Sequence, residues 1–224
     1  MCGRYTLFAN FDTLIERFDI DITVEESLYL PSYNIAPSQS ITAVISDGEH
    51  NRMGKLKWGL VPSWAKDEKI GYKMINARSE TVDDKPSFRQ SFIKRRCLIP
   101  MDSFFEWKTT DAGKLPMRIK LRSNEVFAVA GLWETWKSPS GENLHSCTLL
   151  TTEPNELMLG IHNRMPVIIK RENESDWLNP LLQDKYKLKS LLAPYDAELM
   201  EAFPVSSEVN SPKNNHSGLI NVSV

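Results

Sequence analysis

The stretch from residue 103 to residue 152 decides the fold, and it reads SFFEWKTTDAGKLPMRIKLRSNEVFAVAGLWETWKSPSGENLHSCTLLTT. Four runs of β-branched and aromatic residues, which favour strands, occur in it at 103–108, 115–123, 126–137 and 145–152. Segments rich in turn-forming residues separate the runs, at 109–113, 123–125 and 138–143. Regular spacing of this kind predicts an antiparallel sheet that folds over or partly closes.

The sequence before this stretch predicts a hairpin and a short helix. Residues 40–60 alternate apolar and polar side chains on both sides of a turn that contains glycine, which indicates a hairpin. Residues 8–18 carry apolar side chains at helical spacing behind a capping residue, either Asn10 or Asp12. The amino-terminal end of the chain therefore leads directly into regular structure.

Further helices are expected on both sides of the strand-rich centre. Ser87 and Gln90 match a capping box, which predicts a helix that ends before a strand at 95–100. After the strands, helical patterns occur at 154–162, 175–192 and 196–203, and an exposed loop or tail is expected at 211–218. Together the patterns predict a mixed α+β fold, a single domain (2–224) built on a strongly bent, partly barrel-like, mainly antiparallel sheet with flanking helices.

Composition narrows the classes of function. With 224 residues and a formal net charge of −2, the chain is no polycation, so any nucleic-acid binding must come from a local basic face. No apolar run approaches the roughly 20 residues that span a bilayer, so no membrane role is expected. The four histidines lack the spacing of metal ligands, and no phosphate-binding glycine loop is present. We therefore expect no metal, no cofactor and a monomer.

The three cysteines, Cys2, Cys97 and Cys147, are far apart, and the most informative is the one that follows the initiator methionine. An odd number without a CxxC pair indicates a reduced, intracellular protein. Removal of Met1 would give Cys2 a free α-amine beside its thiol. An ordinary α-amine has a pKa of about 7.7 to 8.0, so an appreciable neutral fraction can attack an aldehyde at neutral pH. The thiol can then close a five-membered thiazolidine ring on the imine.

Several other residues are candidates for chemistry, each with a simpler structural alternative. Strand alternation would place Asn76 and Arg78 on one face with Glu80, which is also what an exposed polar strand looks like. Glu106 lies among aromatic residues, where a carboxyl group suits general acid–base catalysis, although a solvent-facing carboxylate is the simpler interpretation. His162 precedes a proline and could be an ordinary loop histidine.

Two tryptophans allow a similar choice. Trp58 and Trp64 could pack in the core, as most tryptophans do, or offer a platform on which unpaired bases stack. The residue pattern alone leaves both alternatives open.

The joint pattern of motifs is more specific than any single residue. In this order the chain contains MCGRYT (1–6), YNIAPSQ (33–39), WGLVPSWA (58–65), INARSET (75–81), KPSFRQSFIKRRCLIPMDSFFEW (85–107), AGLWETW (130–136) and HNRMPVI (162–168). These segments resemble the SRAP family, the SOS response-associated peptidase domain. The resemblance covers residues 2–170, and the helical part at 171–224 is similar to a more variable family end. Ser103 and Phe105 depart from a glycine and a tyrosine that are common in the family.

The resemblance implies a sensor and shield of abasic sites in single-stranded DNA, which links covalently to the ring-opened sugar through a thiazolidine on Cys2. It implies that Asn76 holds the cysteine end and the sugar, and that Glu106 acts as acid and base. It also implies that His162 helps to form the reactive aldehyde. The same resemblance assigns DNA contacts to Arg4, Arg78, Arg164, Trp64 and Pro37.

Two other classes of function stay open at this stage. The family name reflects a thiol peptidase, autoproteolytic in its simplest form, in which Cys2, Glu106 and His162 would act together. A non-covalent single-stranded DNA-binding module, in which Cys2 is incidental, is the second alternative.

Overall fold

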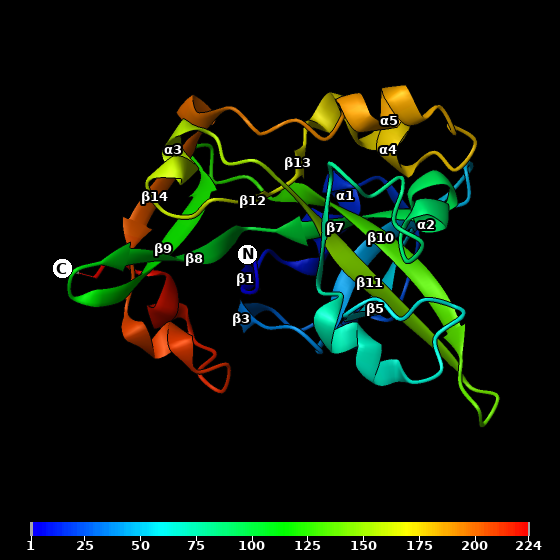
Figure 1. Ribbon diagram of the computed structural model, residues 1–224. Coiled ribbons are helices and arrows are strands. Elements are labelled where there is room, and N and C mark those ends of the chain that lie inside the picture. Colours follow the sequence, from blue (N-terminus) through cyan, green and yellow to red (C-terminus); the bar gives the residue numbers. More distant parts are fainter. Residues whose placement is uncertain (1, 224) are drawn as a thin grey trace.

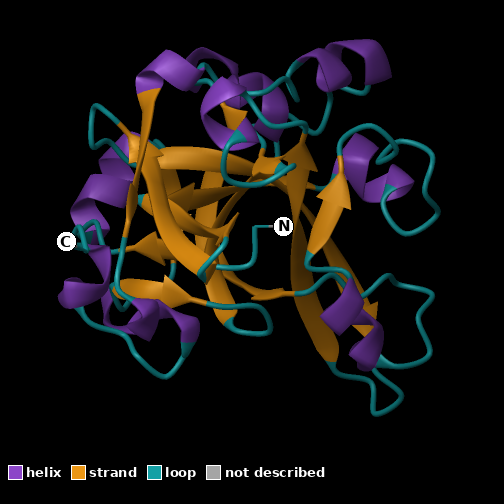
Figure 2. Ribbon diagram, turned by 60° about the vertical axis from the view of Figure 1, so that its left-hand side comes forward, coloured by secondary structure: helices purple, strands orange, loops and turns teal. Residues whose placement is uncertain are grey.

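The computed structural model describes residues 2–223 and arranges them as two β-sheets with short helices around them (Figures 1 and 2). The larger sheet contains β2 (Ile20–Thr23), β4 (Ser40–Ser46), β5 (Asn51–Trp58), β6 (Asn76–Arg78), β7 (Arg96–Met101), β10 (Phe127–Lys137), β11 (Asn143–Thr152), β12 (Met165–Pro166) and β13 (Ile168–Ile169). The smaller sheet has the order β14–β9–β8–β1–β3. Its strands are β1 (Tyr5–Leu7), β3 (Ser32–Ile35), β8 (Ser103–Thr110), β9 (Gly113–Leu121) and β14 (Met200–Pro204).

The larger sheet closes on itself. Strands β11, β10, β7, β4 and β5 are neighbours in that order, and β5 then pairs back with β11 in parallel, with Trp58 opposite Cys147. The result is a five-stranded barrel. Its other contacts between neighbouring strands are antiparallel. The predicted α+β fold on a bent, barrel-like, mainly antiparallel sheet is therefore confirmed.

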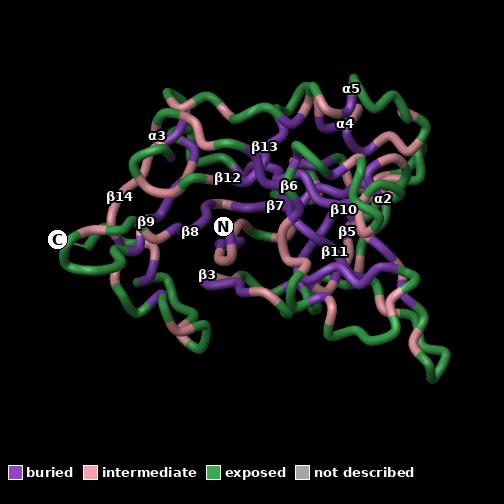
Figure 3. The backbone as a smooth tube through the Cα atoms, in the orientation of Figure 1, coloured by how far each residue is buried: buried purple, intermediate pink, exposed green. Residues whose placement is uncertain are grey.

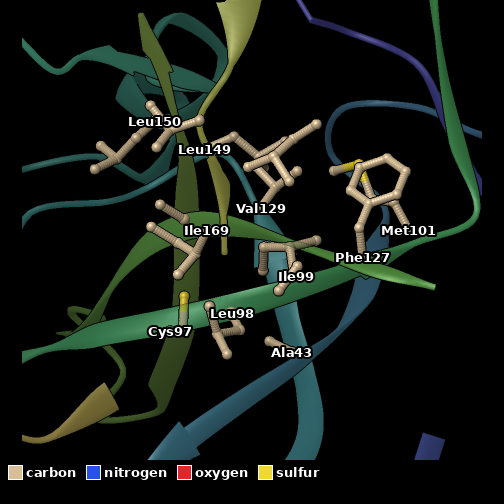
Figure 4. Packing of buried hydrophobic residues seen from close by; sticks show 14 of the residues in the cluster. Ala43, Cys97, Leu98, Ile99, Met101, Phe127, Val129, Leu149, Leu150 and Ile169 are labelled. Carbon is tan, nitrogen blue, oxygen red and sulfur yellow. The ribbon is translucent and has the colours of Figure 1, made fainter. Parts of the chain in front are cut away.

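The barrel interior is narrow and filled by apolar side chains. Figures 3 and 4 show that buried residues concentrate on the barrel strands, with Cys97, Ile99 and Val129 among them. At Gly131 a Cβ atom would lie 2.8 Å from the Cys97 sulfur and 3.2 Å from the Thr148 carbonyl oxygen. Because neither neighbour has room to move in a packed core, the strand needs glycine at this point.

The two sheets share a continuous piece of chain. Strand β7 of the barrel leads through Asp102 alone into β8 of the smaller sheet. The Asp102 carboxylate accepts the backbone N–H groups of Phe8 (2.5 Å) and Ala9 (3.1 Å), which fixes the end of β1 at this crossing. Burial raises the pKa of Asp102, and the two backbone donors oppose that effect.

The helices are short and lie on the outside of the sheets: α1 (Phe11–Arg17), α2 (Arg89–Lys94), α3 (Glu156–Leu159), α4 (Glu174–Leu178) and α5 (Lys185–Ser190). The predicted helix within 8–18 is confirmed as α1, and Asn10 caps it by accepting the Thr13 N–H at 2.7 Å. The hairpin expected at 40–60 is formed by β4 and β5. Within residues 2–223 no helix is long and apolar enough to cross a membrane.

Three local expectations were wrong. The capping box does not form, because α2 begins at Arg89 with Phe88 in the capping position and no side-chain cap. The helix expected at 175–192 is divided into α4 and α5 near Pro180, which cannot continue a helix.

The third correction concerns the helix expected at 196–203. Residues 197–199 form one 3₁₀ turn, and the chain then extends as β14 against β9. The free hydrogen-bonding groups on the edge of β9 are satisfied by this pairing, which outweighs a local helical pattern. The C-terminal part at 171–224 is therefore only partly helical, and it returns to the smaller sheet.

Arg96 ties the helical region to the barrel. Its guanidinium is buried and donates to backbone carbonyls of Trp177, Phe92, Ile93, Asn179 and Leu182. The same guanidinium lies 5.6 Å from the centre of the Trp177 ring. The planar fork of an arginine suits several acceptors at once in a way that a lysine does not.

We expect Arg96→Lys to lower the free energy of unfolding by about 2–4 kcal/mol, because buried carbonyls would lose their donors. Urea unfolding followed by tryptophan fluorescence measures this change. The matched control is Arg171→Lys, which alters an exposed arginine near the same helices and should change stability by less than about 0.5 kcal/mol. Equal stability of the two variants would refute the structural role of Arg96.

Candidate functional site

Cys2 is wholly buried near the amino-terminal end of the chain, which Figure 1 shows in the middle of the molecule. The Asn76 side-chain N–H donates to the Cys2 carbonyl oxygen at 2.8 Å. Asn76 begins β6, which is held in place by parallel pairing with β11, where Asn76 lies opposite Leu149. The closed barrel therefore carries the residue that holds the amino-terminal end of the chain.

Glu106 approaches Cys2 from the smaller sheet. It lies in β8 and is 3% exposed. Strand β1, which follows Cys2, pairs with β8, and the Phe105 N–H donates to the Arg4 carbonyl oxygen at 2.9 Å. Burial raises the pKa of the Cys2 thiol, and the nearby Glu106 carboxylate raises it further. The thiol at this site is therefore held in its neutral form at neutral pH.

Arg4 is held by internal partners that the sequence did not reveal. Its guanidinium donates to Asn34 Oδ1 (2.8 Å) and to the Val209 carbonyl oxygen (2.5 Å), and it lies 5.8 Å from the centre of the Trp107 ring. The Asn34 amide in turn donates to carbonyls of residues 209, 211 and 214, which leaves its oxygen facing Arg4. Asn34 belongs to the YNIAPSQ motif, but its role depends on residues 209–214, which come from the C-terminal part of the chain. We call residues 209–214 the returning segment.

His162 borders an open cleft of about 720 Å³ that Trp107 also lines. Lys114, Glu153 and Asn163 also line this cleft. The His162 ring accepts the Arg164 backbone N–H at Nδ1 (3.1 Å), so in the neutral ring the proton is on Nε2. Trp107 thus connects Arg4 to the cleft of His162, which makes Trp107 a site residue that sequence analysis missed.

Arg164 forms a two-pronged ion pair with Glu80, at 2.6 and 2.9 Å, and also donates to the Thr151 carbonyl oxygen. This contact lowers the pKa of Glu80. The expectation that Glu80 shares a strand face with Asn76 and Arg78 was wrong, because β6 ends at Arg78 and Glu80 lies in the next turn. The Arg78 side chain is exposed and makes no hydrogen bond or ion pair to residues 2–223.

The two tryptophans have different environments. Trp58 is buried, and its indole N–H donates to the Ile75 carbonyl oxygen at 2.9 Å, so it belongs to the core. Trp64 is 58% exposed in a turn that Trp136 anchors through the Ala65 carbonyl oxygen. Pro37 is half-buried at the end of β3. Only Trp64 of the two tryptophans could stack on a base.

The structure thus brings the predicted residues into two connected groups. Cys2, Asn76 and Glu106 meet between the sheets, and Arg164 lies beside Glu80 at the end of the strand that carries Asn76 and Arg78. Arg4 and His162 are linked to each other through Trp107. Cys97 and Cys147 are buried and free on the barrel strands β7 and β11. Among the described residues, 2–223, no cluster of three or more His, Cys, Asp or Glu side chains could hold a metal ion.

Comparison with known proteins agrees with this arrangement. The abasic site processing protein YoqW of Bacillus subtilis (strain 168) is 61% identical over 221 residues, which cover 98% of this chain and 99% of that protein. The abasic site processing protein HMCES of Gallus gallus is 30% identical, over 85% of this chain and 66% of its own length. A crystal structure of a Bacteroides thetaiotaomicron protein superposes with a TM-score of 0.91 at 28% identity, and each chain is covered completely.

A family profile gives the broadest match. The profile described as SOS response associated peptidase (SRAP) matches residues 1–212, which extends well beyond the segment 2–170 that carries the motifs. The match therefore includes the segment around Val209, whose carbonyl oxygen accepts a hydrogen bond from Arg4. The buried amino-terminal cysteine, its asparagine and its neighbouring glutamate are thus features of a chain that belongs to the SRAP family.

Proposed function

We propose that this protein senses abasic sites in single-stranded DNA and shields them by forming a covalent thiazolidine link through Cys2. The observation that carries the proposal is the position of Cys2, which Asn76 holds between the sheets within electrostatic reach of Glu106. The relatives that share 61% and 30% identity are named abasic site processing proteins, which supports the class of substrate. A DNA substrate implies an intracellular, nucleoid-associated location, and we propose that the protein acts as a monomer.

The chemistry requires that Met1, which lies outside the described residues, is removed. The Cys2 amine then attacks the aldehyde carbon of the ring-opened sugar, and loss of water gives an imine. The Cys2 sulfur adds to the imine carbon while the thiol proton passes to the nitrogen, which closes the five-membered ring. The adduct contains all the atoms of the sugar and of Cys2 except those that leave as one molecule of water.

The other site residues would transfer protons or bind the DNA. An abasic sugar is mostly a closed hemiacetal, so its opening needs an acid and a base, and Glu106 and His162 would supply them. Arg4, Arg78 and Arg164 would contact phosphates, while Trp64 and Pro37 would contact the bases beside the lesion. Contacts of this kind carry little sequence information, so we expect binding without sequence preference.

The protonation state of the Cys2 thiol distinguishes the proposed function from that of a thiol peptidase. A peptidase nucleophile needs a lowered pKa, so that a thiolate is present at neutral pH. At Cys2 burial and Glu106 act in the opposite direction. A neutral thiol that adds to an imine in a second step is compatible with that environment, because the amine makes the first attack.

We expect wild-type protein mixed with single-stranded DNA that carries one abasic site to give a band that survives denaturation, and Cys2→Ala to give none. Denaturing gel electrophoresis measures this. Cys97→Ala is the matched control, since it removes another buried cysteine and should leave the adduct intact. Adduct formation by Cys2→Ala at the wild-type level would contradict the mechanism. Salt-sensitive retention without an adduct in wild type would favour the non-covalent binding module.

The same sample tests the removal of Met1. Intact-mass spectrometry of active protein should show a chain that begins at Cys2. A retained methionine would turn the cysteine nitrogen into an amide that forms no imine, so an adduct on such a chain would overturn the thiazolidine scheme.

We expect Glu106→Gln to slow adduct formation about 10²- to 10⁴-fold, because the amide has the same shape but transfers no proton. Single-turnover kinetics over a range of protein concentrations separates the maximal rate from the half-saturating concentration. Only the maximal rate should fall. A change confined to the half-saturating concentration would show that Glu106 binds DNA and takes no part in proton transfer.

The thiol of Cys2 should react slowly with iodoacetamide at pH 8 in folded protein and rapidly in urea. Burial raises the thiol pKa above its unfolded value, so the folded state keeps the proton at a pH where the unfolded thiol begins to ionise. Mass mapping of the alkylated peptides measures each cysteine, and buried Cys147 is the internal reference. Rapid, selective alkylation of Cys2 near neutral pH would instead indicate the reactive thiolate of a peptidase.

A further inference from the structure

Two clefts beside helix α2 form one continuous surface. The larger one, about 470 Å³, lies between α2 and α5, and the smaller one, about 160 Å³, lies beside Trp64. Arg89 and Gln90 line both clefts, so the two clefts adjoin at these side chains. We call the surface formed by Trp64, Arg89, Gln90, Lys94 and Lys185 the α2 groove. In Figure 1 the helices α2 and α5 lie on the same side of the barrel.

The cations of the α2 groove form no ion pairs with the described residues, whereas the two acidic residues that line its clefts are each paired with another basic residue. The side chains of Arg89, Lys94 and Lys185 are exposed and form no hydrogen bond or ion pair to any residue between 2 and 223, and Lys185 is near enough to Asp83 to help lower the pKa of that carboxyl. Asp83, which lines the larger cleft, is bound to Lys189 at 2.9 Å. Glu134, which lines the smaller cleft, is bound to Arg95. In a chain of net charge −2, this leaves a local positive surface without internal partners.

Exposed aromatic side chains adjoin two of these cations, one in the smaller cleft and one in the sequence of α5. Trp64 is 58% exposed in the smaller cleft. Tyr186 follows Lys185 in α5 and is 90% exposed. A positively charged groove accompanied by aromatic side chains is the combination that binds single-stranded nucleic acid, because phosphates contact the cations and bases stack on the rings.

A chain of contacts connects the α2 groove to the arginines of the Cys2 site. Lys189 of α5, which holds Asp83, also donates to the Glu80 carbonyl oxygen at 3.0 Å. Glu80 is in turn the ion-pair partner of Arg164. The turn that follows β6 therefore lies between the two surfaces and touches both, so a DNA strand leaving the Arg78 and Arg164 region could continue along α2.

We propose that the α2 groove is a second DNA-binding surface, which holds the phosphodiester backbone of the single strand on one side of the abasic nucleotide. This inference rests on the proposed function and adds to it a preference for strands that extend beyond the lesion. Three phosphate contacts change the slope of log affinity against log salt by about 2, at roughly 0.7 per contact for a single strand. The groove supplies affinity and plays no part in the covalent step.

The test compares the variant Arg89→Gln/Lys94→Gln/Lys185→Gln with wild type. The matched control, Lys137→Gln/Lys170→Gln/Lys213→Gln, removes the same charge from exposed lysines that also lack partners among residues 2–223. The probes are single strands with a tetrahydrofuran abasic analogue, which forms no adduct. Three strands are compared. One has about 6 nucleotides, and two have about 20 nucleotides, extended from the abasic analogue in one direction or in the other. Fluorescence anisotropy at several salt concentrations measures the affinity.

In wild type, extension of the strand on one side of the analogue should raise the affinity. The groove variant should lose about 10- to 100-fold of that gain at low salt. Its slope of log affinity against log salt should be smaller by about 2. The control variant should keep the gain. An unchanged gain in the groove variant, an equal loss in the control, or no gain from extension on either side would each overturn the proposal.

A parallel reaction keeps the two proposals distinguishable. The groove variant should form an adduct with a short strand that carries a natural abasic site as fast as wild type does, when protein is in excess. A wild-type protein that formed no adduct would refute the proposed function, whereas the length dependence of binding would still report on the α2 groove.

Discussion

The parallel pairing of β5 with β11 is the constraint on which the rest of the structure depends. It closes the barrel at Trp58 and Cys147, and the Gly59 N–H adds a further bond to the Cys147 carbonyl oxygen at 2.8 Å. The chain must then turn across the barrel end, where Gly59 and Gly71 pack backbone against backbone. A Cβ atom on either glycine would lie 2.6–2.7 Å from the carbonyl oxygen of the other, and Gly59 has a positive φ of 133°. This turn delivers β6 to the free part of β11, and with it the asparagine that holds Cys2.

The site forms where the closed barrel meets the smaller sheet. Because β7 continues into β8 through a single residue, Glu106 is delivered close to the amino-terminal end of the chain at a fixed distance from β6. Neither sheet alone contains the site: the barrel contributes Asn76, and the smaller sheet contributes Glu106. Cys2 is wholly buried, and burial raises the pKa of its thiol. In the proposed mechanism this environment would favour loss of water from the first adduct and keep the thiol neutral until the imine is present.

The sequence predicted those parts of the fold that depend on local pattern. Sequence pattern identified the hairpin of β4 and β5 by its alternation, and it identified the four central strands by runs of β-branched and aromatic residues between turn segments. It failed for β14, whose residues look helical but pair with the edge of β9. It also failed for Glu80, because β6 ends at Arg78 and alternation no longer applies in the turn where Glu80 lies. Asn34 and Trp107 were missed as site residues because their partners come from residues 209–214, a long way along the chain.

The three arginines that the family motifs mark are not equivalent in this structure. Arg4 is fixed by Asn34 and the returning segment, and Arg164 is fixed by Glu80. Groups held in place before a ligand arrives lose little conformational freedom on binding, so these two favour a defined geometry. Arg78 and the α2 groove are different, because their cations are exposed and release counterions when phosphate binds. Under the proposed function, a chain with a net negative charge would bind DNA through two kinds of cation: fixed arginines that orient the lesion, and exposed cations that supply the affinity.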